Sequence, residues 1–284
     1  MSQQPKVALV TDSTAYLPAE LIAQHHISVV PVSVVVDGVA YDEGVDISSV
    51  ELADALRRRL TVTTSRPTPA RFLDTYRAAA TVGATDIVSA HLSADMSGTY
   101  DSAVIAARES PIPVRVLDTR SVGMAMGFAI LDGARTADAG GTVEEVTAAV
   151  MDRIATSSAL FYVDTLEYLR RGGRVTAAAA AVGQALSVKP ILELVDGRVV
   201  PCERVRTSAK ALARLTELAV QRAAGRPCDV AVQHLDAAAR AESLAELLAA
   251  ALTDAHILVS EVGAVVGAHV GPGMVAVGIA PRPA

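Results

Sequence analysis

The sequence of 284 residues is poor in aromatic residues and in cysteine. Aromatic side chains make up 3% of it, tryptophan is missing, and 51% of the residues are hydrophobic. We therefore expect a core of alanine, valine, leucine and isoleucine. Cys202 and Cys228 lack the spacing of a metal or redox motif, and we interpret them as isolated thiols in a reducing cytosol.

Long apolar runs and an excess of positive charge are also lacking. No run reaches the roughly 18 apolar residues of a membrane helix, and the first expected strand leaves no room for a signal peptide. The formal net charge of −6 disfavours nucleic acid binding through a general electrostatic footprint. We predict a cytoplasmic protein with no nucleic acid partner and no stable membrane insertion.

Strand-like and helical patterns alternate over the first half of the chain, which predicts a mainly parallel sheet with helices on its faces. Beyond about residue 160 the pattern changes. We predict two α/β domains, residues 1–157 and a second, smaller one at 158–284. Asp37-Gly38 and Asp196-Gly197 predict tight hairpin turns. Strands are expected at 6–11, 27–36, 86–92, 114–117, 160–163, 190–195, 198–202, 229–234 and 256–260, and helix caps at Ser48 or Ser49, Thr68 and Thr142.

Two hydroxyl-rich loops, Thr-Thr-Ser-Arg-Pro at 63–67 and Ser-Ala-Asp-Met-Ser-Gly-Thr at 93–99, are the most informative segments. Each follows an extended segment and precedes a helix, where hydroxyls and unpaired N–H groups form an anion site. Neither loop contains a general base, a glycine-rich phosphate cradle or a set of metal ligands. They therefore indicate binding of a small anion such as a carboxylate, although Thr64 and Ser97 equally fit ordinary caps and turns.

Three basic side chains lie beside glycines or strand ends. His269, in the glycine-rich segment 267–273, fits either a packed core residue or a hydrogen-bond donor to a carboxylate. Arg174 follows a double-glycine turn and Arg206 precedes an expected helix. Each fits a solvated end of an element, and together they fit a patch for phosphate oxygens.

A run of small side chains at 176–186 has two readings. It fits tight helix packing, or a wall that leaves room for a long apolar ligand. Met124, Met126 and Phe128 fit either adaptable lining of such a tunnel or plain core.

Seven blocks run in order over essentially the whole chain, at 10–14, 64–67, 92–100, 166–174, 189–192, 205–207 and 269–273. Together they resemble the DegV family. The resemblance implies two α/β domains with a long-chain fatty acid between or beneath them. It implies presentation of this lipid to a fatty acid kinase, similar to dihydroxyacetone kinases, which makes the acyl phosphate from ATP. It implies no catalytic residue, cofactor or metal in the binding protein itself.

The resemblance also implies roles for single residues. Thr64 and Ser97 would hold the fatty-acid carboxylate, with Ser65, Gly98 and His269 completing that site.

Arg174 and Arg206 match the family's basic positions, which are associated with the kinase and with phosphoryl transfer. The sequence departs from the family at Arg66, where glutamine is usual, and at Asp95, near a usual glycine. A charge at Asp95 beside a carboxylate site is unfavourable unless that side chain points to solvent.

Two rival functions remain open. A serine-nucleophile acyl hydrolase or transferase would use Ser97, with His269 as the only plausible base within about 2.6–3.2 Å, but no Gly-x-Ser-x-Gly elbow supports it. A structural or regulatory partner would have an empty pocket. Ester turnover favours the enzyme, and a stoichiometric bound lipid without turnover favours the carrier.

Overall fold

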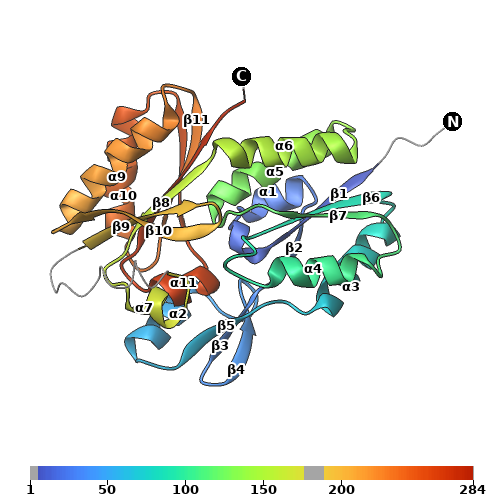
Figure 1. The fold of residues 1–284 in the computed structure, drawn as a ribbon, viewed down its shortest axis with the longest axis horizontal. Helices are drawn as coiled ribbons and strands as arrows, with labels where there is room; N and C mark the ends of the chain where they lie inside the picture. The colour runs from blue at the N-terminus through green and yellow to red at the C-terminus, as the bar shows by residue number, and fades with distance from the viewer. Residues whose placement is uncertain (1–5, 176–188, 284) are drawn as a thin grey trace. The chain divides into compact units, whose positions relative to one another are not determined.

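The computed structural model describes residues 6–175 and 189–283 (Figure 1). The chain divides into two compact units: unit 1 consists of Met1–Ser33 and Ser65–Ala155, and unit 2 of Val34–Thr64 and Thr156–Ala284. The predicted division into 1–157 and 158–284 differs from this grouping at residues 34–64. Unit 2 is consequently the larger unit, whereas the sequence predicted a smaller second domain. The run 176–186 lies outside the described residues, so its role stays a prediction.

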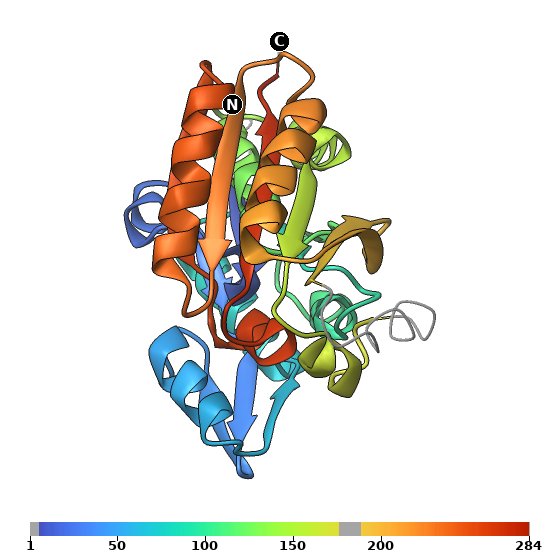
Figure 2. The ribbon, with the colours of Figure 1, turned by 90° about the vertical axis from the view of Figure 1, so that its left-hand side faces the viewer.

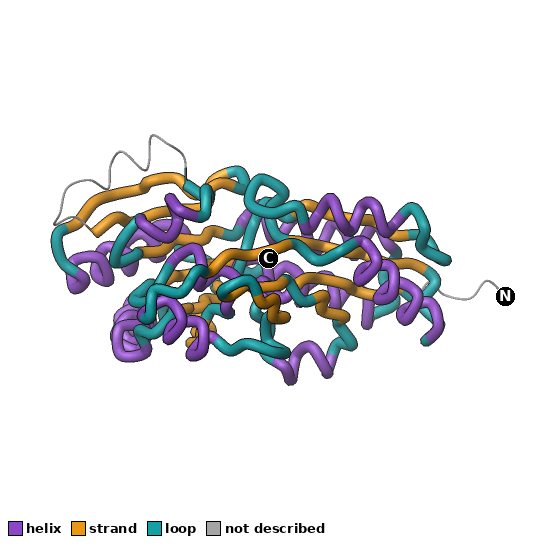
Figure 3. Tube along the Cα trace, turned by 90° about the horizontal axis from the view of Figure 1, so that it is seen from below, coloured by secondary structure: helices purple, strands orange, loops and turns teal. Residues whose placement is uncertain are grey.

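Unit 1 contains a four-stranded sheet in the order β2-β1-β6-β7. All three strand pairs are parallel, which confirms the predicted parallel sheet. Helices and strands largely alternate along this part of the chain. Figure 3 distinguishes the helices from the strands by colour. The elements are β1 (Val7–Asp12), η1 (Ser13–Ala15), α1 (Ala19–Gln24), β2 (Ser28–Val30), α3 (Pro69–Thr81), β6 (Asp86–His91), α4 (Thr99–Ala107), β7 (Val114–Asp118), α5 (Met124–Asp138) and α6 (Val143–Thr156).

Helices cover both faces of this sheet, as a buried parallel sheet requires. Alternate residues of β1 point to opposite faces. Val10 packs in a core cluster with Phe72 of α3. Leu9 lies on the other side, near Gly133 of α5, where an added methyl group would meet both Leu9 and Val150 of α6.

Unit 2 contains a six-stranded sheet in the order β10-β9-β8-β13-β11-β12. Only β11 and β12 are parallel among its pairs of described strands. Helices α9 and α10 pack against the sheet (Figure 1). Leu215, Leu244 and Val277 are fully buried in the core there. The elements are β8 (Ser158–Tyr162), α7 (Glu167–Arg171), β9 (Lys189–Val195), β10 (Arg198–Val205), α9 (Ser208–Ala223), β11 (Cys228–His234), α10 (Ala238–Ala251), β12 (Ala255–Glu261), α11 (Ala264–Val270) and β13 (Val275–Pro281).

Residues 34–64, which join unit 2, contain most of a separate three-stranded sheet in the order β4-β3-β5. Helix α2 follows this sheet's first two strands and packs on α11, where Gly267 approaches Leu52; Figure 2 shows the pale-blue segment next to the red helix. The predicted single strand over 27–36 is wrong, because it breaks at Pro31-Val32 and the N–H of Val32 donates to Ser13 Oγ at 3.1 Å. The elements are β3 (Ser33–Val36), β4 (Val39–Asp42), α2 (Ser49–Arg57) and β5 (Val62–Ser65).

Local signals in the sequence are confirmed. Ser48 forms a capping box with Glu51 at the start of α2, and Thr68 caps α3 with proline at the first helical position. The turn between β3 and β4 has positive φ at both Asp37 and Gly38, as the Asp-Gly pair predicts. Among the described residues, no helix is both long and apolar enough to span a bilayer.

Candidate functional site

A pocket of about 470 Å³ lies within unit 2. The end of α2, strand β5, helix α7 and helix α11 all contribute to its wall. Its lining combines hydroxyl groups, basic side chains and a few apolar side chains. The lining residues are Leu56, Arg59, Leu60, Thr61, Val62, Thr63, Thr64, Tyr168, Arg171, Gly172, Arg174, Ala268 and His269.

Two residues that the sequence singled out meet in this pocket. Oγ1 of Thr64 lies 2.9 Å from Nε2 of His269, although the residues are 205 positions apart. Thr64 is on strand β5, which was predicted as a loop. The strand forms because it pairs with β3, and Asp37 ties its start through the N–H of Thr61, which donates to Oδ1 at 2.9 Å.

The backbone around His269 is held from both sides. At the start of α11, the N–H of Val265 donates to Oε1 of Glu43 at 2.7 Å. Beyond the helix, NH1 of Arg240 donates to the carbonyl of Gly273 at 3.0 Å. A side chain at Gly172 would overlap Nδ1 of His269, so the double-glycine turn leaves room for the imidazole ring.

His269 is neutral at pH 7. Burial, together with the smaller effect of the nearby positive charge of Arg174, lowers the pKa of the imidazole to about 4. A neutral imidazole has one N–H donor and one acceptor nitrogen. With the Thr64 hydroxyl, the pair therefore offers two donors to an acceptor such as a carboxylate oxygen once their mutual hydrogen bond opens.

The two predicted arginines have different environments. Arg174 lines the pocket and donates to the carbonyl of Gly172. Arg206 is exposed. Val175, the residue after Arg174, forms a β-bridge with Val199 near the start of β10. Arg206 directly follows the last residue of that strand. At about 3.3 Å per residue, roughly 20 Å of strand separates the two positions.

Ser97 and Gly98 precede α4 in unit 1. Oγ of Ser97 lies 2.9 Å from Oγ1 of Thr99 and accepts from the N–H of Thr99 at 3.3 Å. Gly98 packs against the guanidinium of Arg66, which a side chain at that position would overlap. Asp95 is exposed, with an Oδ2 atom 4.0 Å from NH2 of Arg120, so its charge is solvated.

The hypothesis that Ser97 is a catalytic nucleophile gains no support within unit 1. In the part of this unit that the structure describes, the side-chain partner of Ser97 is the Thr99 hydroxyl and not a histidine or carboxylate. Likewise, the described residues contain no group of three His, Cys, Asp or Glu side chains that would hold a metal ion.

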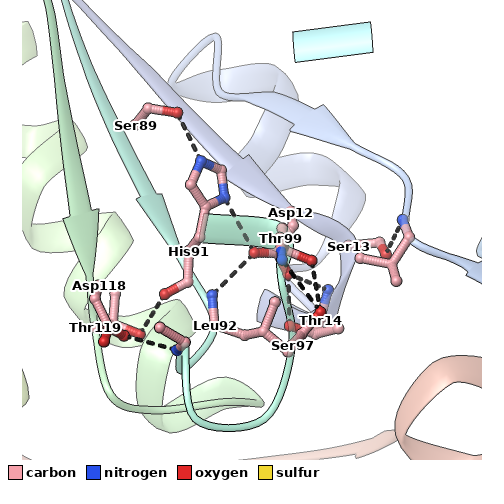
Figure 4. Close-up of polar contacts among 12 residues, drawn as sticks. Asp12, Ser13, Thr14, Ser89, His91, Leu92, Ser97, Thr99, Asp118 and Thr119 are labelled. Carbon is pink, nitrogen blue, oxygen red and sulfur yellow. Dashed lines mark hydrogen bonds and ion pairs between the residues drawn. The ribbon is translucent and has the colours of Figure 1, made fainter. Parts of the chain in front are cut away.

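A second histidine forms a network that the sequence did not reveal. In unit 1, the carboxylate of Asp12 accepts from the N–H of Leu92 at 3.0 Å and contacts Nδ1 of His91 at 3.1 Å (Figure 4). Nε2 of His91 lies 2.7 Å from Oγ of Ser89, which contacts the hydroxyl of Tyr76 at 2.9 Å. Asp12 also caps η1, because its Oδ1 accepts from the N–H of residue 14 at 3.1 Å.

This network is closed, in the sense that its side chains have no contact with solvent. Asp12, Ser89, His91 and Tyr76 are fully buried, and burial raises the pKa of the Tyr76 phenol to about 12. Its sequence positions carry no local motif, because the four side chains come from two strands and a helix. The arrangement resembles an Asp-His-Ser triad in order, but its serine is inaccessible to a substrate.

Comparison with known proteins identifies the family. The sequence model of "Uncharacterised protein, DegV family" matches residues 6–282. A DegV domain-containing protein of Streptomyces coelicolor is 56% identical over 279 residues, covering 97% of this chain and 99% of the relative. One from Mycobacterium tuberculosis is 37% identical over 273 residues, covering 95% of this chain and 96% of the relative.

Solved structures agree with these sequence matches. A DegV family protein from Thermus thermophilus, described as binding fatty acid, superimposes with a TM-score of 0.91 at 33% identity, covering 98% of this chain and 100% of that one. DegV from Bacillus subtilis, described as a fatty acid binding protein, gives a TM-score of 0.90 at 32% identity, with 98% and 100% covered. The chain belongs to the DegV family, as its sequence blocks predicted.

Proposed function

We propose that this protein binds a long-chain fatty acid and presents its carboxylate to a separate fatty acid kinase of the dihydroxyacetone-kinase type. The observation that carries the proposal is the hydrogen bond between Thr64 and His269 in a pocket with basic side chains. The fatty acid binding described for the relatives from Thermus thermophilus and Bacillus subtilis supports the same ligand class.

At the Thr64–His269 pair itself, the carboxylate would meet neutral hydrogen-bond donors. The hydroxyl of Thr64 and an N–H of neutral His269 are suited to donate to it. Ser65, Ser97 and Gly98 are proposed as further headgroup residues on the strength of the family resemblance. Each hydrogen bond to a charged group contributes about 1.5–3 kcal/mol, which corresponds to roughly ten-fold or more in affinity.

The kinase supplies the phosphoryl group in this proposal. The headgroup residues form no nucleophile–base pair within the described part of unit 1, which fits a carrier better than a hydrolase. Arg174 and Arg206 are proposed to serve the kinase and phosphoryl transfer. Their separation along β10 favours contact with an extended partner surface over one shared phosphate patch.

The binding proposal is tested with the purified full chain by native mass spectrometry and by titration with hexadecanoate. We expect one lipid per chain, no ester hydrolysis, and about ten-fold weaker binding for Thr64→Val. Thr216→Val is the matched control, because it removes a hydroxyl whose hydrogen-bond partner among the described residues is the carbonyl of Leu212 in α9. Ester turnover without bound lipid, or equal affinity in both variants, contradicts the proposal.

The kinase proposal has a separate test in a reconstituted reaction with a fatty acid kinase and ATP. Arg174→Ala and Arg206→Ala should each lower acyl phosphate formation strongly while hexadecanoate affinity stays nearly unchanged. Lysine should restore only part of the rate, because a point charge does not reproduce bidentate contacts to phosphate. A loss of lipid binding in proportion to the rate would instead make these arginines pocket or fold residues.

A further inference from the structure

Three consecutive arginines at the end of helix α2 differ in what they contact. NH2 of Arg57 lies 2.7 Å from Oδ2 of Asp236, and NH1 of Arg58 lies 3.5 Å from Oδ2 of Asp54. Arg59 lines the unit 2 pocket, and its guanidinium makes no hydrogen bond or ion pair with any residue that the structure describes. Of the three cations, the one that faces the pocket lacks a carboxylate partner.

The backbone at Arg59 has a conformation that favours glycine. Its φ is 59°, in the left-handed region. The N–H of Arg59 donates to the carbonyl of Leu56 and the N–H of Leu60 to that of Ala55, both at 3.0 Å, which is the usual closing pattern of a helix. Glycine adopts this φ without the steric cost that any other side chain bears.

The charge of the pocket is one-sided. Its charged lining residues are Arg59, Arg171 and Arg174, and the described lining contains no carboxylate. Arg171 is paired with Glu167 on its own helix. One fatty-acid carboxylate would bring a single negative charge, whereas a phosphate group brings nearly two and several acceptor oxygens.

We infer that Arg59 and the neighbouring pocket wall form a subsite for the phosphate group of a long-chain acyl phosphate, beside the Thr64–His269 pair. This inference rests on the proposed function, because it assigns the same pocket to the product as well as to the fatty acid. The planar guanidinium of Arg59 contacts the phosphate oxygens, and the Thr64–His269 pair stays with the acyl end of the headgroup. The subsite therefore distinguishes the phosphorylated lipid from the free fatty acid.

The test compares two lipids that share a chain and differ in headgroup. Hexadecylphosphonate is a stable stand-in for the acyl phosphate, and hexadecanoate is the free fatty acid. We expect Arg59→Ala to weaken phosphonate binding by about ten-fold while hexadecanoate affinity changes less than about two-fold. Arg59→Lys should recover part of the loss. Arg58→Ala is the control, because it removes a neighbouring arginine that does not line the pocket.

Arg59→Gly adds a readout that a purely structural role would not give. It relieves the left-handed strain, so the melting temperature should rise while phosphonate binding falls. Inorganic phosphate that competes with hexadecylphosphonate in the wild type but not in Arg59→Ala shows that the subsite also takes free phosphate. The absence of such competition assigns it to the lipid phosphate alone.

Several results overturn the inference. Wild-type protein that binds hexadecanoate but not the phosphonate overturns the subsite and leaves the proposed function standing. Equal losses for both lipids in Arg59→Ala, or no loss for either, also overturn it. Protein that binds neither lipid overturns the proposed function first, and the subsite with it.

Discussion

The two histidine-centred clusters of this protein differ in their access to solvent. In unit 1, His91 is fully buried, and both ring nitrogens contact buried side chains, Asp12 and Ser89. In unit 2, His269 is partly exposed, contacts the hydroxyl of Thr64, and lines a pocket. Both are polar clusters near the ends of strands, so residue type alone does not distinguish them.

This difference indicates which of the two clusters a ligand can reach and bind. A buried polar network whose groups satisfy one another fixes the fold, and opening it leaves unpaired groups in a medium of low dielectric constant. Phe72 also packs edge-on against His91, with ring centroids 4.9 Å apart. The pair at His269 instead lies beside solvent-accessible space and basic side chains. In the proposed function, an anion would replace its one hydrogen bond with two.

The largest expected effect is the loss of the buried carboxylate. Asp12→Ala leaves His91, the N–H of Leu92 and the cap of η1 without their acceptor. We expect the free energy of unfolding to fall by about 3–5 kcal/mol, measured by urea denaturation. Asp12→Asn keeps part of the acceptor capacity and should cost less. A loss below about 1 kcal/mol for Asp12→Ala would mean that the network does not stabilise the fold.

The second effect is the dependence of stability on pH. The pKa of His269 falls from 6.5 in the unfolded chain to about 4 in the fold, so protonation favours unfolding. The stabilisation is complete above pH 6.5 and is lost as the pH falls from 6.5 through about 4. We expect a contribution of order 2 kcal/mol to this acid loss, which His269→Gln removes. Parallel stability curves for the two proteins between pH 7 and 4 would contradict the neutral buried imidazole.

The third effect concerns alanine substitutions of the two glycines of the double-glycine turn, which should have different consequences. Gly172 has an ordinary φ of −73°, and an added methyl group would overlap His269. Gly173 has a φ of +70° and open space around it. Gly172→Ala should therefore weaken hexadecanoate binding by about ten-fold, whereas Gly173→Ala should lower the melting temperature with little change in affinity. The reverse pattern would show that the imidazole position does not matter for binding.

The smallest effect is expected at the edge of the closed network. Tyr76→Phe removes the hydroxyl that contacts Ser89, while the buried ring stays in the core. The free energy of unfolding should fall by about 1 kcal/mol, and fatty-acid affinity should not change. Thermal unfolding and hexadecanoate titration of the same samples check both parts. Impaired binding with unchanged stability would reverse the roles of the two clusters.

Local features were predictable from the sequence, because neighbouring residues create them. The cap at Thr142 with Glu145, and the turns at Asp37-Gly38 and Asp196-Gly197, are present as expected. Helix α11 was not predicted: it is short, its N-cap residue Gly263 offers no capping side chain, and it is apolar around most of its surface.

Features that depend on tertiary pairing were beyond the sequence pattern. Thr64 and His269 were each singled out, but only the pairing of β5 with β3 and the packing of α11 on α2 bring them together. Nothing in the local sequence marked His91 as the centre of a network. Arg59 was likewise indistinguishable from Arg58, because the αL turn and the missing carboxylate partner are visible only in the fold.

The central claim is that the open cluster binds the ligand and the closed one supports the fold. Titration of Thr64→Val and Ser89→Ala with hexadecanoate, under conditions where both variants are folded, tests it most directly. Each variant removes one hydroxyl that contacts a histidine. The account predicts about ten-fold weaker binding for Thr64→Val and wild-type affinity for Ser89→Ala. Wild-type affinity for Thr64→Val together with impaired binding by Ser89→Ala would contradict it.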